Sequence, residues 1–236
     1  MSEPPAPRVE TQAFRFHGVA LLADGEGALV WPEERTLVVA DLHLEKGSSF
    51  ARRGVMLPPY DTRATLERLQ RAAIRHDALR IICLGDSFHD GEAPAWLDAE
   101  DRALLAALSS SRELIWVAGN HDPEPPEDLG GRVALGAFRL GPLTLRHVAE
   151  PLFAGGEVSG HYHPKASVDV RRRRISGRCF VQDEQRLVLP AFGAYAGGLD
   201  VFDPALRALF PGDFAVQLLA RNRITPLPHA RLAGYG

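Results

Sequence analysis

Short apolar runs alternate with amphipathic segments in the first half of the chain. The runs within residues 27–44, 79–86 and 113–122 are rich in Val, Ile and Leu, which predicts buried strands. Segments 60–77 and 97–111 separate these runs and carry apolar residues at intervals of three and four, which predicts helices. This strand–helix–strand–helix–strand order indicates βαβ units and therefore a parallel sheet.

The starts and apolar sides of the two helices follow from the same pattern. Asp61 is placed to cap the first helix, and Asp98 is placed to cap the second. The apolar positions at helical spacing are Leu66, Leu69, Ala73 and Ile74 in the first helix and Leu104, Leu105 and Leu108 in the second. Each helix is thus expected to present one apolar side.

Outside this region the pattern is mostly that of strands. Residues 13–24 predict strands with a glycine turn. From about Gly130, glycine and proline divide short apolar stretches, which predict strands within residues 132–148, 155–164, 166–181, 186–192 and 213–224. No linker or internal repeat separates the halves, so we expect a disordered tail at 1–12 and a single domain at 13–236.

Composition limits the class of protein. Hydrophobic residues make up 45% of the 236 residues and charged residues 24%, which is ordinary for a soluble globular protein. The formal net charge of −3 gives no whole-protein attraction to nucleic acid, so such binding would need a local basic patch. Two cysteines do not make a disulfide framework and suit a reducing compartment. Because no leader or membrane-spanning run is evident, we expect a cytoplasmic protein that does not bind membranes.

Five predicted strands are followed by residue types that bind metals or transfer protons. These residues are Asp41 and His43, Asp86, Asn120 with His121 and Asp122, His147, and His161 with His163. In parallel α/β sheets the carboxyl ends of strands are where loops converge on a functional crevice. Alternate residues of an extended chain, such as His161 and His163, face the same side and can reach one ion. The combination predicts a metal site.

Each of these residues alone has an ordinary structural explanation. A single Asp after a strand is commonly a turn or capping residue, and Gly-Asn-His can form a type I′ turn. The set as a whole holds too many ligands for one ion, and a carboxylate such as Asp86 can bridge two. Because the set mixes Asp, Asn and His without Cys, it favours manganese or iron, with zinc as an alternative. We therefore expect two divalent metal ions, with Mn²⁺ as the first choice.

The order of these motifs resembles that of a known enzyme family. The motifs are Asp41-x-His43, Gly85-Asp86, Gly119-Asn120-His121-Asp122, His147 and Gly160-His161-x-His163. Over residues 36–165 they are similar to the calcineurin-like metallophosphoesterases. The resemblance implies an α/β fold of two packed β-sheets flanked by helices, in four layers α/β/β/α. It also implies a ligand set: Asp41, His43 and His163 on one metal, Asn120, His147 and His161 on the other, and Asp86 between them.

The resemblance implies a reaction as well. A hydroxide shared by the two cations would attack phosphorus in line, and His121 would be the general acid that protonates the leaving oxygen. Asp86 or Asp122 could tune His121, although Asp122 could equally be a turn residue.

Two departures from the family pattern remain. Gly85-Asp86 is followed by Ser-Phe-His-Asp, where many relatives carry an acidic residue sooner, and no glycine follows His147. Neither departure removes a predicted ligand, but the first leaves the roles of His89 and Asp90 open.

A narrower resemblance suggests a substrate. Residues 40–54, 85–90, 159–166 and 187–201 together are similar to the bacterial DNA ligase-associated metallophosphoesterases. This resemblance implies a manganese-dependent DNA endonuclease or phosphodiesterase in DNA repair, acting on DNA that we expect to be single-stranded. It also implies functional association with an ATP-dependent DNA ligase, a nuclease and a helicase.

Candidate substrate contacts lie close to the motifs. Arg52 and Arg53 could bind phosphates, and Phe88 and His89 follow the second motif directly. Phe88, Phe192 and Tyr195 could stack on bases, although core packing is the usual role of such aromatic residues. The Arg171–Arg174 run could bind nucleic acid or form a solvated basic edge that discourages sheet aggregation.

Two other functions are compatible with the sequence. One is a phosphomonoesterase or a pyrophosphohydrolase that acts on a small nucleotide or lipid substrate. The other is an interaction protein that has this fold but no activity. The presence of His121 together with a full ligand set favours an enzyme.

Overall fold

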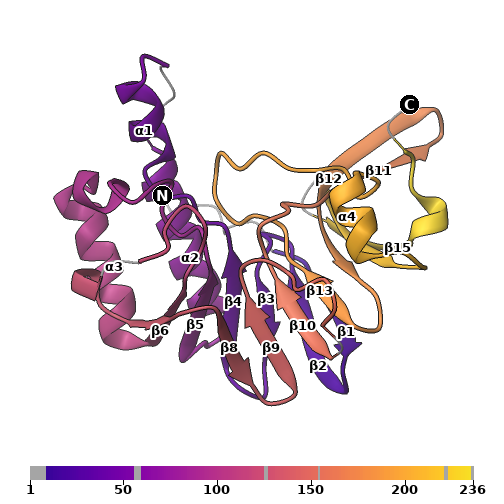
Figure 1. Ribbon diagram of the computed structural model, residues 1–236, viewed down its shortest axis with the longest axis horizontal. Helices are drawn as coiled ribbons and strands as arrows, with labels where there is room; N and C mark the ends of the chain where they lie inside the picture. Colours follow the sequence, from indigo (N-terminus) through magenta and orange to yellow (C-terminus); the bar gives the residue numbers. More distant parts are fainter. Residues whose placement is uncertain (1–8, 56–59, 125–126, 154, 221–222, 235–236) are drawn as a thin grey trace, which may run out of the picture.

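The computed structural model describes residues 9–55, 60–124, 127–153, 155–220 and 223–234. Within these ranges the chain forms two β-sheets with helices beside them (Figure 1). The four helices are α1 (Lys46–Arg52), α2 (Asp61–Arg75), α3 (Ala99–Ser111) and α4 (Pro204–Leu209). Three single turns of 3₁₀ helix are η1 (Ala93–Trp96), η2 (Glu127–Leu129) and η3 (His229–Arg231).

The first sheet contains seven strands in their order along the chain. They are β1 (Thr11–Phe16), β2 (Val19–Asp24), β3 (Leu29–Trp31), β4 (Thr36–Ala40), β5 (Arg80–Leu84), β6 (Glu113–Val117) and β7 (Arg132–Ala134). Strands β1 to β4 pair antiparallel, whereas β4 to β7 pair parallel. Parallel neighbours need crossover connections, and α2 and α3 provide them between β4, β5 and β6. The predicted βαβ units are therefore confirmed.

The second sheet contains eight strands, in the order β15-β14-β12-β13-β10-β9-β8 with β11 paired to β12. They are β8 (Ala137–Leu140), β9 (Leu143–Arg146), β10 (Gly156–Ser159), β11 (Lys165–Val170), β12 (Arg173–Gln182), β13 (Arg186–Val188), β14 (Ala215–Ala220) and β15 (Arg223–Pro228). Strands β9, β10 and β13 are parallel neighbours, and the other pairs are antiparallel. The second half of the chain thus supplies its own sheet, as expected.

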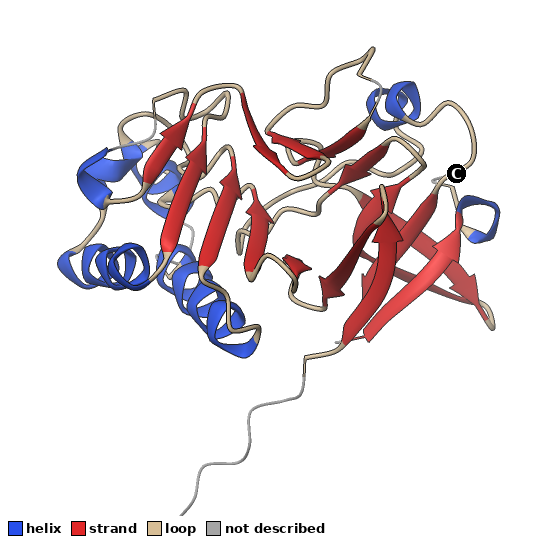
Figure 2. Cartoon of the chain, turned by 90° about the horizontal axis from the view of Figure 1, so that it is seen from below, coloured by secondary structure: helices blue, strands red, loops and turns tan. Residues whose placement is uncertain are grey.

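Three apolar clusters hold the layers together. Val38 of the first sheet and Val158 of the second belong to the cluster between the sheets. The outer face of the first sheet packs on α2 and α3, where Leu66 is fully buried. The outer face of the second sheet packs on α4 through Leu206. Figure 2 shows helices beyond both sheets, so the predicted α/β/β/α order is confirmed.

The two predicted helix caps have different outcomes. The carboxylate of Asp98 accepts a hydrogen bond from the Asp101 amide at 2.7 Å, so this cap is confirmed. Asp61 is the first residue of α2 and does not cap it, because Tyr60 occupies the cap position. The Asp61 carboxylate instead accepts a hydrogen bond from the Gly47 amide of α1 at 3.1 Å. That prediction was wrong, since the carboxylate joins two helices.

One predicted core position also lies elsewhere. Leu66, Leu69 and Ala73 of α2 are fully buried as expected, but the side chain of Ile74 is 63% exposed. Ile74 lies one position beyond the stripe that faces the sheet, so its side chain turns to solvent.

One boundary and two helices differ from the sequence prediction. Strand β1 begins at Thr11 and pairs with β2 from its first residue, so residues 11 and 12 belong to the sheet and not to the expected tail. Residues 1–8 of that tail lie outside the described residues. Helices α1 and α4 have no counterpart in the predicted elements. No described helix is long and apolar enough to cross a membrane.

Candidate metal centre

The predicted ligands lie at the carboxyl ends of strands from both sheets. Asp41 and His43 follow β4, Asp86 follows β5, and Asn120 follows β6 of the first sheet. His147 follows β9, and His161 and His163 follow β10 of the second sheet. The seven side chains come together where the two sheets pack face to face.

The first group of ligand atoms comprises Asp41, His43 and His163. The Nε2 atoms of His43 and His163 lie 3.3 Å apart, and His163 Nε2 lies 3.3 Å from Asp41 Oδ1. Asp41 and His43 are buried, and His163 is partly exposed at the mouth of the site. The group therefore combines one carboxylate and two imidazoles at an accessible position.

The second group comprises Asp86, His147 and His161, with Asn120 beside it. His147 Nε2 lies 3.3 Å from Asp86 Oδ2, 3.2 Å from His161 Nδ1 and 2.8 Å from Asn120 Oδ1. The other ring nitrogen of His147 donates to the Leu84 carbonyl at 3.0 Å. This bond fixes the tautomer and leaves Nε2 free to bind a metal, as is usual for ligand histidines.

The two groups are adjacent. His147 Nδ1 of the second group lies 3.7 Å from Asp41 Oδ1 of the first, and Asp41 Oδ2 accepts a hydrogen bond from the His161 amide at 2.9 Å. Ligand atoms at about 2.1 Å from a shared ion lie about 3.0–3.4 Å from each other. The separations given above fall in or close to this range, and all the ligand atoms of a group lie within 4.8 Å of one another, so the donor set fits two neighbouring divalent cations.

The electrostatics of the site favour positive charge. Burial alone would raise the pKa of Asp86, but the hydrogen bond and charge of His147 outweigh it and hold the pKa at about 2. Burial lowers the pKa of His43 to about 3, with a contribution from the charge of His163, so this imidazole is neutral. Burial acts against a charged His147, yet Asp86 and Asp41 raise its pKa. An ionised Asp86 and a neutral His43 are in the forms that bind metals, whereas His147 would have to release the proton that these carboxylates favour.

The backbone at the ligands adopts a conformation that is uncommon for residues with a side chain. Asp41, His43, Asp86, His161 and His163 all have φ between 44° and 70°. Left-handed backbone of this kind costs about 1–2 kcal/mol per residue and concentrates at functional sites. The backbone conformation at these residues therefore lowers the stability of the fold but directs their side chains to one point.

Glycines beside the ligands allow the close approach of the loops. A Cβ atom at Gly119 would overlap the backbone and carboxylate of Asp86, and one at Gly85 would overlap the His147 ring. A Cβ atom at Gly160 would lie 2.7 Å from Asp41 Oδ2. The glycines of the Gly-Asp, Gly-Asn-His and Gly-His-x-His motifs are thus required by packing.

His121 lies at the edge of the site and belongs to neither ligand group. Its amide donates to Asp86 Oδ1 at 2.9 Å, and its Nδ1 donates to the His89 carbonyl at 2.9 Å. Its Nε2 lies 4.0 Å from Asp86 Oδ2, and the side chain is 43% exposed. The ring therefore presents Nε2 at the accessible side of the metal groups.

Asp122 has a structural role that the sequence left undecided. One oxygen of its buried carboxylate accepts hydrogen bonds from the amides of Ser87 and Phe88, at 2.9 and 3.1 Å. Burial raises the pKa of Asp122 to about 7. This carboxylate ties the loop after β6 to the loop after β5, so it orients Asp86 and His121 together.

Phe88 packs in the core, which is the usual role of such an aromatic residue, and cannot make the substrate contact considered for it. The side chain is fully buried, and its ring lies 6.1 Å from that of Trp116 in the core. The loops after β4 and β5 continue to pair beyond the strands, with a bridge between Leu44 and Phe88, which directs Phe88 inward. Phe192 is likewise buried, with the Arg68 guanidinium 4.4 Å above its ring.

The other predicted substrate contacts lie beside the site. Arg52 and Arg53, at the end of α1, line an open cleft of about 470 Å³ together with Ser49, Asp90, Gly91, Glu92 and Trp96. The Arg52 guanidinium lies 4.4 Å from the Trp96 ring, and Arg53 lies 3.8 Å from Asp90. His89 connects this cleft to the metal groups, because its ring stacks on that of His121 at 5.7 Å. Trp96 and Ser49 were missed, since nothing in the sequence ties η1 to α1.

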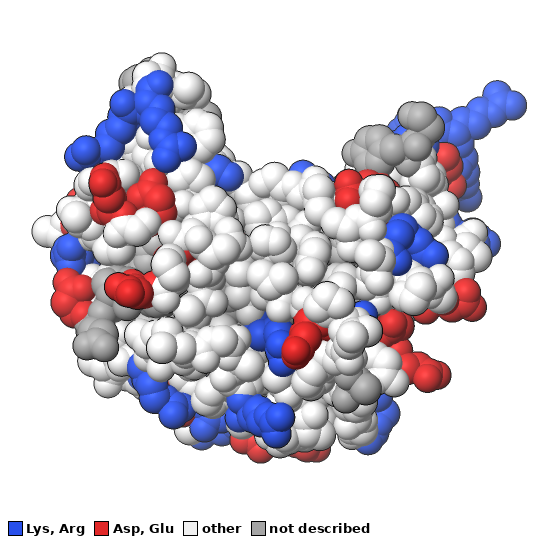
Figure 3. Space-filling model, viewed as in Figure 1, with Lys and Arg blue, Asp and Glu red and all other residues white. Residues whose placement is uncertain are grey.

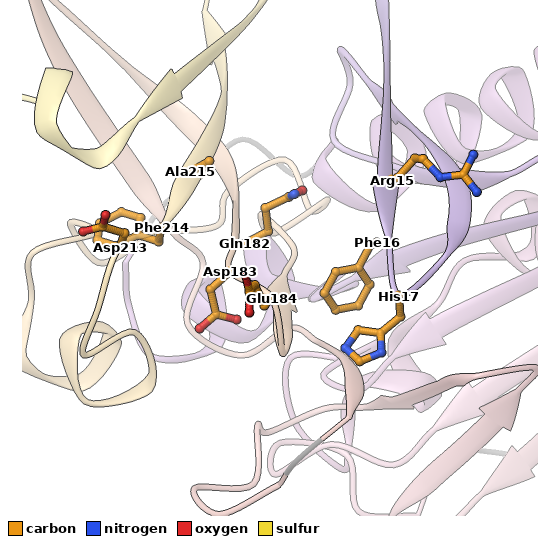
Figure 4. A pocket seen from close by; sticks show the side chains of 9 residues that line it. All are labelled: Arg15, Phe16, His17, Gln182, Asp183, Glu184, Asp213, Phe214 and Ala215. Carbon is orange, nitrogen blue, oxygen red and sulfur yellow. The ribbon is translucent and has the colours of Figure 1, made fainter.

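A second open cavity, of about 480 Å³, contains none of the predicted site residues. Figure 4 shows Phe16 and His17 on one side of it, Asp213 and Phe214 on the other, and Asp183 between them. The β1–β2 and β12–β13 turns form its walls, at the opposite ends of the strands from the metal groups. The predicted metal ligands therefore lie at the other end of the sheets.

Comparisons with known proteins agree with this geometry. The family model of the calcineurin-like phosphoesterases matches residues 34–178, which is more than half of the chain. Among solved structures, the chain is similar to the nuclease MPE of Pseudomonas putida, with 29% identity, 92% of this chain and 100% of that chain covered, and a TM-score of 0.71. YfcE, a phosphoesterase from E. coli, is 17% identical over 81% of this chain and 97% of its own, with a TM-score of 0.46.

A comparison with curated protein sequences gives no match. The family model covers all five motifs and both ligand groups. The chain therefore belongs to the calcineurin-like phosphoesterase family.

Proposed function

We propose that this phosphoesterase is a dimetal phosphodiesterase that cuts single-stranded DNA internally. The observation that carries the proposal is the pair of adjacent ligand groups, each of which mixes carboxylate oxygen with imidazole nitrogen. Two cations held side by side are suited to phosphoryl transfer. Such a mixed oxygen and imidazole set favours manganese or iron, and we take Mn²⁺ as the first choice.

The ligand assignment follows the two groups. Asp41, His43 and His163 would hold one cation, and His147 and His161, with Asn120, would hold the other. Asp86 would bridge them. The chemistry supplied by two bound cations is the activation of a water molecule and compensation of the charge that develops on the phosphoryl oxygens.

His121 is the group that we assign to proton transfer. Its Nδ1 donates to the His89 carbonyl, so Nε2 is the nitrogen left to face a substrate. Because the ring is partly exposed and outside both ligand groups, it can protonate a leaving oxygen without disturbing a metal. Asp122 holds the two loops that place this ring and Asp86, and so acts as a positioning residue.

Two observations favour DNA over a small substrate. The similar structure from Pseudomonas putida is that of a nuclease. The cleft beside the metal groups is open, and its lining includes Arg52 and Arg53, which are suited to phosphate contacts, together with Asp90 and Glu92. A phosphomonoesterase or pyrophosphohydrolase of small nucleotides or lipids is the alternative. A role in DNA repair beside an ATP-dependent DNA ligase, a nuclease and a helicase stays a prediction of the resemblance.

A closed circle of single-stranded DNA tests the proposed activity. The circle has no ends, so a linear product in the presence of Mn²⁺ requires an internal cut. We expect linear product with the wild type and with His17→Ala, a histidine variant in a distant turn, and almost none with His121→Ala. An intact circle, together with hydrolysis of a simple aryl phosphate, would instead support the alternative with a small substrate.

The role of His121 can be tested separately from metal binding. His121→Ala should keep the wild-type metal content, measured by elemental analysis, but lose about 10²–10⁴-fold in the rate of DNA cleavage. With bis(p-nitrophenyl) phosphate the loss should be much smaller, because p-nitrophenolate leaves without a proton. Equal losses on both substrates would contradict proton donation to the leaving group.

A further inference from the structure

The β11–β12 hairpin is a basic arm that begins at the metal centre. Its first strand starts at Lys165, two residues after the ligand His163, and Figure 1 shows the hairpin rising at the upper right of the molecule. Val170 pairs with Arg173, so the tip is a two-residue turn of Arg171 and Arg172. A strand of six residues spans about 20 Å, which sets the reach of the arm.

The two residues of the turn at the tip are of a type that is disfavoured in the backbone conformation of this turn. Arg171 and Arg172 have φ of 49° and 63°, the left-handed conformation that two-residue hairpin turns require at both positions. Asn-Gly is the low-energy choice there, whereas two arginines cost backbone energy and repel each other. Residues that do not suit the backbone conformation of their turn are commonly explained by a function of their side chains.

The charges of the arm are largely uncompensated. Residues 165–178 contain six basic residues and one acidic residue, Asp169, in a chain whose net charge is −3. Arg171 to Arg174 are all exposed. Among the ion pairs of the described residues, the run takes part only through Arg174, which lies 3.5 Å from Asp169. The tip therefore presents positive charge to solvent at a fixed distance from the metal groups.

The space-filling view places this arm opposite α1. Figure 3 shows a hollow between two prominences, with lysine or arginine side chains on both. In the same view Figure 1 places α1 at the left prominence and the β11–β12 hairpin at the right. The ligand-bearing ends of β4 and β10 lead into these two elements, so the metal groups lie between them.

We propose that the β11–β12 hairpin is an arm that binds the phosphate backbone of the nucleic acid substrate away from the bond that is cut. The inference rests on the proposed DNA activity and adds a second contact region to it. At about 3.4 Å per stacked nucleotide, a reach of about 20 Å corresponds to roughly six nucleotides. Arg171 and Arg172 contact phosphates and not bases, so the arm binds without regard to sequence.

The test removes the charge without harming the turn. In Arg171→Asn/Arg172→Gly the preferred Asn-Gly turn replaces two arginines, so the hairpin should fold at least as well and the melting temperature should not fall. Arg171→Gln/Arg172→Gln removes the same charges but keeps side chains at both positions. Affinity for a 30-nucleotide single strand and for a 6-nucleotide strand is measured by fluorescence anisotropy over a range of salt concentrations.

Both variants should bind the long strand roughly five- to tenfold more weakly at low salt, and the slope of log affinity against log salt should fall by about 1.4. Their affinity for the short strand should change much less. The control Arg71→Gln/Arg139→Gln, which removes two exposed charges from α2 and β8, should leave the long-strand affinity as it is.

Other outcomes would overturn the inference. Wild-type affinity and slope in both tip variants would mean that the run is only a solvated basic edge, while DNA cleavage by the wild type would still support the proposed function. An equal loss in the Arg71/Arg139 control would show that net charge, and not the arm, governs binding. A wild type that neither binds nor cuts DNA would remove the proposed function and the arm together.

Discussion

The two sheets supply different chemical groups to the same centre. The first sheet contributes the predicted oxygen ligands, Asp41, Asp86 and Asn120, with a single imidazole from His43. The predicted ligands of the second sheet are all histidines, namely His147, His161 and His163. Each ligand group nevertheless draws on both sheets. Neither sheet contains a complete site, and the packing between the two sheets creates it.

The second sheet adds a further contact to a means that both sheets share. Left-handed backbone occurs at Asp41, His43 and Asp86 after strands of the first sheet and at His161 and His163 after β10 of the second. In the second sheet, the segment after His147 is held by the buried Arg186, which donates to the carbonyls of Glu150 and Pro151, each at 2.7 Å, and to Glu157 at 3.1 Å. Both sheets therefore rely on local backbone geometry, and the second also has a buried cation that holds the segment after His147.

The largest expected effect comes from breaking the group that the two sheets share. Asp86→Ala removes the proposed bridging carboxylate and the partner of His147, so metal should be lost from the protein. We expect kcat/KM for bis(p-nitrophenyl) phosphate to fall by at least about 10²–10³-fold. Metal content by elemental analysis is the second readout. Asp90→Asn, in the same loop, should keep its metal, and an Asp86→Ala protein that keeps both metals would contradict the bridge.

Arg186→Met tests the anchor of the second sheet. It leaves the fully buried Glu157 with Arg146, at 3.3 Å, as its remaining cation and frees the carbonyls of residues 150 and 151. Breaking a buried ion pair from one side typically costs about 3–5 kcal/mol, so the midpoint of urea unfolding should fall markedly. Arg139→Met, on an exposed position of β8, should change stability by less than about 0.5 kcal/mol. Similar midpoints for the two variants would mean that Arg186 is not the anchor.

The smallest expected effect is that of Asp98→Ala, which should lower the stability of the first sheet and its helices without changing the activity. Loss of the cap on α3 should lower the free energy of unfolding by about 1 kcal/mol, measured by thermal or urea unfolding. kcat/KM should stay unchanged, because α3 stabilises the outer face of the sheet and touches no ligand. Asp98→Asn, which can still cap, should recover most of the stability. A loss of activity in Asp98→Ala would link the helix layer to the site.

The positions of the predicted ligands could be read from the sequence because each is marked by the few residues that precede it. A run of apolar residues that ends in Asp or His marks the carboxyl end of a strand, and Asp41, Asp86 and His147 all follow such runs. Parallel strand order then brings these ends to one edge, which is a property of the fold class. The left-handed backbone at the ligands was not predictable, since Asp and His occur there only because the surrounding structure imposes it.

Features that depend on tertiary contacts could not be read from the sequence. Helix α1 contains Gly47 and two serines and lacks an apolar stripe, and the Asp61 carboxylate helps to hold it. Phe88 follows a polar motif, yet pairing between two loops turns it into the core. The contact of Trp96 with Arg52 joins elements that are more than forty residues apart. In each case the deciding partner is distant in the chain.

The division of ligands between the sheets also sets the time at which the enzyme can become reactive during its own synthesis. A chain made from its amino end completes the first sheet at Ala134, before any of the three histidines of the second sheet exists. At that stage one ligand group lacks His163 and the other lacks His147 and His161. A cation that meets the unfinished chain would find two partial sets of candidate ligands. We therefore expect metal loading to be a late event, completed only after the strands of the second sheet have been made.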